Sequence, residues 1–220
     1  MHLYSQDLYN ATNIGANAFW YVKIHSIDCP NLASLSSSAF RENTVLTNVD
    51  CLGKISSIPN DCFSQDTALQ TVKIPYECTS IEASAFYGCS SLTSITQYNK
   101  SLDDYAEGES PTFTNISRIT SFGNSCFYNC KLLSLTASDL SGAVSIGNSA
   151  FEKCSAISIN TLDLSSVNTI GDNAFRDGPH IDNVVWSNSQ TVLPVGVFGS
   201  AVLKSITNID HVTKIYGRVL

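Results

Sequence analysis

The chain has 220 residues, with 12 lysine and arginine residues against 19 aspartate and glutamate residues, and a formal charge of −7. A hydrophobic fraction of 43% is enough for a buried core, which argues against disorder along the whole chain. The acidic balance argues against nucleic-acid binding, because phosphate contacts need clustered lysine and arginine. No apolar run approaches the roughly 18 residues of a membrane span. The first residues also lack the basic and apolar regions of a signal peptide.

A six-residue pattern recurs along the chain: an apolar residue, three variable residues, a small residue and phenylalanine. Its eight copies end at Phe19, Phe40, Phe63, Phe86, Phe127, Phe151, Phe175 and Phe198. Neighbouring phenylalanines are 21 to 24 residues apart, except for a gap of 41 between Phe86 and Phe127. A fixed period of this length is typical of a repeat solenoid, in which each coil buries its apolar face against its neighbours.

Within each coil, a short alternation of apolar and polar residues follows the phenylalanine and predicts a strand. Val72–Ile74, Leu133–Leu135 and Ile157–Ile159 are such segments. Glycine after the first apolar residue, as at Gly147, suits a turn that leaves the buried position. We therefore expect one leucine-rich-repeat solenoid over residues 1–220, with eight to nine coils, one short strand per coil of about 23 residues, and little helix. The phenylalanines should stack as an internal spine.

These residues resemble the BspA-like, or Treponema-type, leucine-rich repeats, whose pattern reads roughly Ile-Gly-x-x-Ala-Phe-x-x-Cys-x-x-Leu-x-x-Ile. Ile81–Ile95 and Ile146–Ile157 follow it closely, and the similarity extends from Ile14 to Leu220. The cysteine position departs from the pattern in five coils, at Val22, Asn43, Asp66, Gly178 and Ala201. The resemblance implies a non-enzymatic binding module, extracellular or on a cell surface, that contacts proteins or glycans, as in adhesion.

The long gap between Phe86 and Phe127 predicts a departure from the array near residues 97–115. One interpretation is an insertion, Gln97–Asn115. The other is a degenerate coil that places Glu107 on the spine, which we disfavour because an unpaired buried carboxylate is costly. The insertion is either a contact loop or a solvated excursion without a role in binding. As a contact loop, it offers acidic and aromatic side chains: Tyr98, Asp103, Asp104, Tyr105, Glu107 and Glu109.

The outward residues of the predicted strands form a second candidate surface. They are small and polar, and they lack the tryptophan, tyrosine and arginine residues that usually anchor binding hot spots. Trp20 and Trp186 are expected to pack in the array rather than to bind a partner. The candidate contacts on the strands include Thr71, Lys73, Ser94, Thr96, Ser134 and Thr136.

The eight cysteines could suggest a disulfide or metal framework, but the repeat explains most of them. Cys89, Cys130 and Cys154 share one column, and Cys62 and Cys126 replace the small residue before phenylalanine, so these five fit as small buried hydrophobes. Neighbours in the column would lie within disulfide range, so Cys89–Cys130 or Cys130–Cys154 pairing stays open. Zinc, calcium and phosphate-binding spacings are missing, and so are catalytic motifs. We expect no catalytic residue, metal or cofactor.

The last residues, Ile215–Leu220, begin a ninth coil. We expect the array to continue in a longer chain, or to pack on a partner or a second copy at this end, because solenoids normally cover their open ends. Leu3, Leu8 and Tyr9 are placed to cover the other end. Two alternatives to recognition follow: a structural spacer or assembly subunit of a surface layer or phage fibre, and an intracellular scaffold with reduced thiols.

Overall fold

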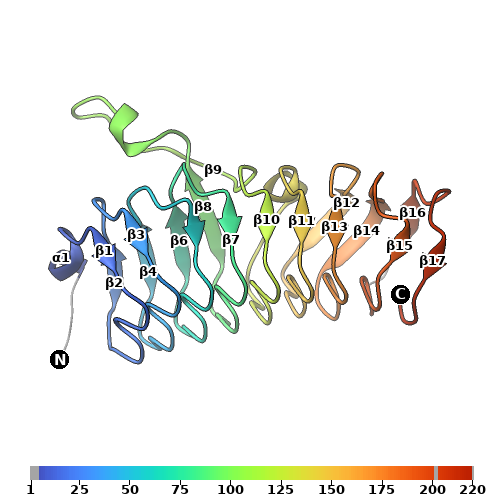
Figure 1. Ribbon diagram of the computed structural model, residues 1–220, viewed down its shortest axis with the longest axis horizontal. Helices are drawn as coiled ribbons and strands as arrows, with labels where there is room; N and C mark the ends of the chain where they lie inside the picture. Colours follow the sequence, from blue (N-terminus) through green and yellow to red (C-terminus); the bar gives the residue numbers. More distant parts are fainter. Residues whose placement is uncertain (1–4, 201–202, 220) are drawn as a thin grey trace.

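The computed structural model describes residues 5–200 and 203–219, and Figure 1 shows an elongated solenoid whose coils advance along one axis. The predicted repeat solenoid with little helix is confirmed. Among the described residues, helical structure is confined to three single turns: α1 (Ser5–Leu8), η1 (Leu102–Asp104) and η2 (Ala137–Leu140). The described parts of the two chain ends lie at opposite ends of the molecule.

Each coil carries a two-residue strand at the apolar residue that opens the repeat pattern, and these strands pair in parallel between coils. They are β1 (Asn13–Ile14), β3 (Ser34–Leu35), β5 (Ser57–Ile58), β7 (Ser80–Ile81), β10 (Ser121–Phe122), β11 (Ser145–Ile146), β13 (Thr169–Ile170), β15 (Val192–Leu193) and β17 (Lys214–Ile215). The expectation of one strand per coil missed this column, because two residues are too short to show an alternating pattern.

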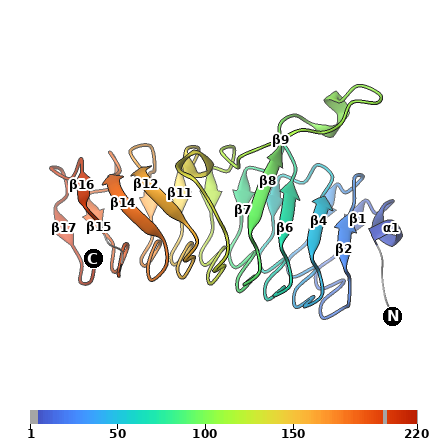
Figure 2. The ribbon, with the colours of Figure 1, turned by 180° about the vertical axis from the view of Figure 1, so that it is seen from behind.

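Longer parallel strands form the other face of the solenoid, which Figure 2 shows in front. Their alternate side chains are buried, as predicted for half-buried strands. They are β2 (Ser26–Asp28), β4 (Asn48–Cys51), β6 (Thr71–Ile74), β8 (Ser94–Tyr98), β12 (Ser158–Asp163), β14 (His180–Val185) and β16 (Ser205–Thr207).

The predicted strand at Leu133–Leu135 does not form, and the longer strands fall into two sheets on either side of it. Thr136 begins η2 instead, since its backbone N–H and hydroxyl both donate to Asp139 Oδ2 at 2.7 Å. This capping box turns the chain away from the strand path.

The phenylalanine spine is continuous from Phe19 to Phe198. Successive rings are stacked, with centroids 5.3 to 5.8 Å apart and interplanar angles of 2 to 16°. Phe86 stacks directly on Phe127 at 5.3 Å, so the residues between them include no additional spine position. β7 likewise pairs directly with β10 across the same gap. Glu107 is exposed and lies away from the spine.

The turn around each spine phenylalanine contains two left-handed residues, two positions before and two positions after the ring. Ser84 (φ 55°) and Gly88 (φ 72°) flank Phe86 in this way. The glycine after the first apolar residue has another role than the predicted turn. A Cβ at Gly147 would lie 2.6 Å from the backbone nitrogen of Asn124, so this glycine permits close approach of two coils.

The cysteine column satisfies backbone carbonyls of the spine. The thiols of Cys89, Cys130 and Cys154 lie 2.9 to 3.0 Å from the carbonyl oxygen of the spine phenylalanine in the preceding coil. All eight cysteines are free and buried, so neither open disulfide pairing is present. Burial raises the pKa of the Cys154 thiol to about 12. These thiols are therefore packing elements and weak donors rather than nucleophiles.

Two coils replace this cysteine by a buried polar residue. Asn43 Nδ2 donates to the Phe19 carbonyl at 2.7 Å, which is the bond that a cysteine makes elsewhere. The Asn43 backbone N–H donates to Asp66 Oδ1 at 2.7 Å, and Asp66 Oδ2 is buried without a partner among the described residues. Burial raises the pKa of Asp66 well above its usual 3.8. Burial thus favours the neutral form of the Asp66 carboxyl inside the array.

Part of the N-terminal end is covered by α1, which packs against β2. Leu8 is buried there, whereas Tyr9 is half exposed. Leu3 lies outside the described residues. The first spine ring, Phe19, is only partly buried, because no earlier coil stacks on it.

Candidate functional site

The segment between Phe86 and Phe127 leaves the array as a hairpin, and Figure 1 shows it extending from β8 back toward the N-terminal coils. At its root, Gln97 and Tyr98 of β8 pair antiparallel with Thr114 and Phe113 of β9 (Phe113–Thr114). The side chain of Gln97 is buried, and its Nε2 donates to the carbonyls of two residues in the preceding coil, at 2.9 and 2.7 Å. This root is therefore part of the packed array.

Tyr98 belongs to the same root rather than to the contact surface. Its side chain is buried, and its hydroxyl donates to the Asp50 carbonyl at 3.0 Å. Its ring lies 4.8 Å from that of Phe113. Burial raises the pKa of the Tyr98 hydroxyl, so it stays protonated and remains a donor.

The body of the hairpin is held by contacts that are mostly exposed. Asp103 forms an ion pair with Lys54 of an earlier coil, and Glu109 pairs with Lys100 at 2.9 Å. Lys100 lowers the pKa of Glu109 through this bond. The Tyr105 hydroxyl donates to Asn99 Oδ1 at 2.6 Å. Exposed ion pairs contribute little stability, so these contacts orient the hairpin without anchoring it strongly.

The remaining acidic residues of the hairpin point to solvent. The side chains of Asp104 and Glu107 are exposed and form no hydrogen bond or ion pair with another described residue. Of the six candidate residues in this segment, the structure therefore places Tyr98 in the packed root and the other five on the body. Asp104 and Glu107 are free to meet a partner.

A hollow of about 430 Å³ lies between the hairpin and the N-terminal coils. One side is formed by Leu102 and Asp103, and the other by residues 30–33 and Lys54. The Lys54–Asp103 ion pair spans the two sides. The sequence could not indicate this hollow, because it depends on the direction in which the hairpin extends.

The outward face of the longer strands lies beside the hairpin root. Thr71, Lys73, Ser94 and Thr96 line a shallow depression on β4, β6 and β8, as their predicted register places them. Lys73 Nζ forms an ion pair with Asp50 Oδ1 at 3.0 Å and lies 5.1 Å from the centre of the Phe113 ring. Lys73 thus connects the strand face to the hairpin.

Two predicted strand-face residues are placed differently. Ser134 and Thr136 are exposed, but Ser134 lies within the segment Leu133–Leu135 where no strand forms, and Thr136 caps η2. They do not continue the depression lined by Thr71 and Ser94.

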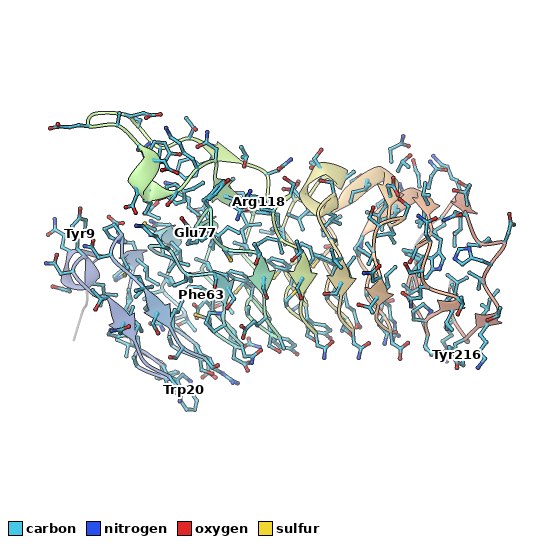
Figure 3. The ribbon with its side chains drawn as sticks, turned by 45° about the horizontal axis from the view of Figure 1, so that its top comes forward. Tyr9, Trp20, Phe63, Glu77, Arg118 and Tyr216 are labelled. Carbon is cyan, nitrogen blue, oxygen red and sulfur yellow. The ribbon has the colours of Figure 1, made fainter. Side chains whose placement is uncertain are left out.

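One exposed cluster was missed by the sequence interpretation. Trp20 is half exposed and Tyr21 is 78% exposed at the edge of the first coil, where Figure 3 labels Trp20. The Arg41 guanidinium lies 5.8 Å from the Trp20 ring. Trp186, by contrast, is fully buried, and its Nε1 donates to the Gln190 carbonyl at 3.1 Å. An aromatic pair directly after Phe19, where other coils carry mostly polar residues, was the available signal.

The described residues contain no group of three or more His, Cys, Asp and Glu side chains that could hold a metal ion. In the part of the chain that the structure describes, no helix is both long and apolar enough to cross a membrane.

The repeat pattern and the solenoid agree with a sequence comparison. The BspA type leucine rich repeat region matches residues 8–108 and 104–220, with six copies. The chain belongs to the BspA-type leucine-rich repeat family. The predicted family is therefore confirmed. Proteins built from leucine-rich repeats generally serve as interaction modules. No curated protein matches the chain.

A solved structure supports the leucine-rich-repeat fold. A leucine-rich repeat protein from Bacteroides ovatus ATCC 8483 is similar with a TM-score of 0.69 and 19% identity, over 94% of this chain and 48% of that one. The chain thus spans about half the length of that protein. A leucine rich cell surface protein from Faecalibacterium prausnitzii A2-165 matches over 95% of this chain and 74% of that one, with 20% identity and a TM-score of 0.38.

Proposed function

We propose that this chain is a non-catalytic recognition module, displayed outside a cell, that binds a protein or glycan surface through the hairpin and the adjoining strand face. The observation that supports this proposal most strongly is that the array continues without a break across the hairpin. Phe86 stacks on Phe127 across it, so the core does not need the hairpin body. Loops that a solenoid core does not require, and that expose charged and aromatic groups, are frequent recognition elements.

The strand face contributes the second half of this proposed surface. Lys73 and Phe113 lie where the depression on β6 and β8 meets the hairpin root. A partner resting on Thr71, Ser94 and Thr96 would therefore touch the hairpin as well. The strand face by itself offers small polar groups, so binding there would depend on shape and many weak contacts rather than on a single anchor residue.

The test uses a variant with a shortened hairpin and an intact root. Removing all of Gln97–Asn115 would leave the carbonyls bonded by Gln97 without their donor. Replacing residues 99–112 by Asn-Gly keeps Gln97, Tyr98, Phe113 and Thr114, and a two-residue turn suits the Tyr98–Phe113 pair. Wild type and the shortened chain are compared on a glycan array and on a panel of extracellular-matrix proteins.

A ligand bound by the wild type and lost by the shortened chain, at an unchanged melting temperature, supports the proposal. The double substitution Asp104→Asn and Glu107→Gln separates charge from shape, because both side chains are exposed without partners. Equal binding by the shortened chain contradicts the assignment to the hairpin.

A structural role is the second candidate, and the C-terminal end favours it. Ile215 is 68% exposed and Tyr216 is half exposed there. Among the described strands, β16 pairs only with β14 and β17 only with β15. Concentration-dependent association in analytical ultracentrifugation, abolished by Ile215→Asp and unchanged by the shortened hairpin, would support assembly through this end. A monomer at all concentrations would contradict self-assembly.

A further inference from the structure

The position directly after each spine phenylalanine forms a column on the edge of the solenoid, and one coil leaves a gap in it. Six coils place a long side chain there: Trp20, Arg41, Tyr87, Tyr128, Glu152 and Arg176. Ser64 is smaller, but it is buried. The Phe198 coil instead has Gly199 at this position and Gly196 two residues before the phenylalanine. A hollow of about 290 Å³ opens at this gap.

The two glycines keep this hollow open. A Cβ at Gly196 would lie 2.4 Å from Asn173 Oδ1, and the residue has a φ of +58°. A Cβ at Gly199 would lie 3.3 Å from Arg176 Cγ and 3.4 Å from the Arg218 carbonyl. A larger residue at 199 would therefore occupy the space between the two arginines.

Two of the four arginines of this acidic chain line the hollow. The other two, Arg41 and Arg118, lie over the rings of Trp20 and Tyr76. Arg176 bonds Asp177 through Nε at 3.2 Å, and no bond from its terminal nitrogens to another described residue is present.

The other polar side chains of the hollow also have hydrogen-bond donors without partners among the described residues. The side chains of Arg218, Asn173 and Ser200 make no hydrogen bond or ion pair with another described residue. The nearby carboxylate of Asp172 accepts from the Val195 backbone N–H at 2.9 Å and does not line the hollow. The cavity therefore concentrates unpaired donors, and two guanidinium groups match the planar oxygens of a carboxylate.

We propose that this hollow binds the carboxylate of an acidic saccharide unit, with Arg176 and Arg218 holding the carboxylate and Asn173 and Ser200 bonding ring hydroxyls. The volume is at the lower end for a ligand pocket and admits a single sugar unit. Val195 is the one aliphatic side chain in its lining, so the cavity offers little to an apolar ligand. This site lies far along the chain from the hairpin and does not depend on the function proposed above.

The test is a two-dimensional NMR titration of the labelled chain with galacturonate, with neutral galactose and inorganic sulfate as parallel probes. We expect saturable shifts of the Gly196, Gly199 and Ser200 amide signals by galacturonate, in the range of about 1 mM, and none by galactose. Arg176→Gln and Arg218→Gln should each weaken binding about tenfold. Arg41→Gln, in the same column but beside Trp20, is the matched control and should bind as the wild type.

A second variant fills the gap in the column with a long side chain. Gly199→Gln places in this coil the kind of side chain that other coils carry, and it should abolish the shifts while the fold is kept. Equal binding of galactose and galacturonate overturns the proposal, as do shifts by sulfate without shifts by galacturonate. Undiminished galacturonate binding by Arg176→Gln and Arg218→Gln, with melting temperatures like that of the wild type, overturns it too.

Discussion

The stacked array and the hairpin at residues 99–112 belong to one chain but are held together by different forces. In the array, phenylalanine rings stack at 5.3 to 5.8 Å, and a backbone ladder joins each coil to the next. In the hairpin, the contacts are exposed ion pairs such as Lys54–Asp103 and the hydrogen bonds of the Tyr105 hydroxyl. Stability therefore resides in the array, and the hairpin is free to vary in sequence without unfolding the protein.

The largest effect is expected from a spine substitution. Phe127→Ala removes a fully buried ring stacked between Phe86 and Phe151, and it should cost about 3–5 kcal/mol of unfolding free energy. Tyr105→Ala in the hairpin body, where the hydroxyl makes only exposed hydrogen bonds, should cost about 1 kcal/mol. Urea unfolding followed by circular dichroism measures both. Similar costs would contradict the separation of the two regions.

Replacing one glycine by alanine in the array and one in the hairpin gives a matched pair of variants. Gly53 and Gly108 both have positive φ, so alanine is strained at either position. A Cβ at Gly53 would lie 2.1 Å from the Leu32 carbonyl oxygen, whereas Gly108 has open space around it. Gly53→Ala should therefore lose about 1–3 kcal/mol more than Gly108→Ala, because a backbone collision is added to the strain. Thermal unfolding of the two variants checks this difference.

Asp66 makes the array sensitive to pH. In the unfolded chain its carboxyl ionises near 3.8, but burial raises the pKa in the folded state, so the folded form holds the proton more tightly. Its contribution to stability is complete below about pH 3.8 and declines as the pH rises toward the folded-state pKa. Asp66→Asn keeps an acceptor for the Asn43 backbone N–H without the ionisable carboxyl, and it should stabilise the protein by about 1–3 kcal/mol at neutral pH.

Melting temperatures of wild type and Asp66→Asn at about pH 3.5 and pH 7.5 test this coupling. The difference between the two proteins should shrink at the lower pH. Asp104→Asn, on the exposed hairpin, is the control and should show no such change. A constant difference at both pH values would mean that Asp66 is ionised in the folded chain.

The smallest effect is expected at the ion pair between the hairpin and the array. Lys54→Gln removes the partner of Asp103 and should cost about 0.5 kcal/mol or less, since the pair is exposed. Hydrogen exchange at residues 102–104 should nevertheless become faster, because the hairpin loses its contact with the earlier coil. Lys131→Gln, on an exposed lysine without an ion pair to another described residue, should change neither quantity.

The sequence predicted the placement of the strand-face candidates on β6 and β8, where the repeat is regular, but not of Ser134 and Thr136, where no strand forms. Thr71 and Ser94 lie where the period of the repeat places them, because register in a solenoid is inherited from the neighbouring coil. Tyr98 was taken for a contact residue, yet it is buried beneath the hairpin root, since residue type alone does not tell which part of an excursion packs. Trp20 and Arg41 were missed because their proximity joins two coils.

What the sequence determined by itself was the repeat: its period, its phenylalanine spine and its buried small residues and cysteines. A repeating apolar pattern can bury itself in very few ways, so the local signal is enough to define the coil. The tertiary structure alone decided where the hairpin lies, which strand is missing at Leu133–Leu135, and that Arg176 and Arg218 share one hollow. The hairpin direction and the shared hollow arise between coils, from residues 40 to 50 positions apart, whereas the missing strand follows from the local cap between Thr136 and Asp139. No periodic pattern in the sequence encodes these features.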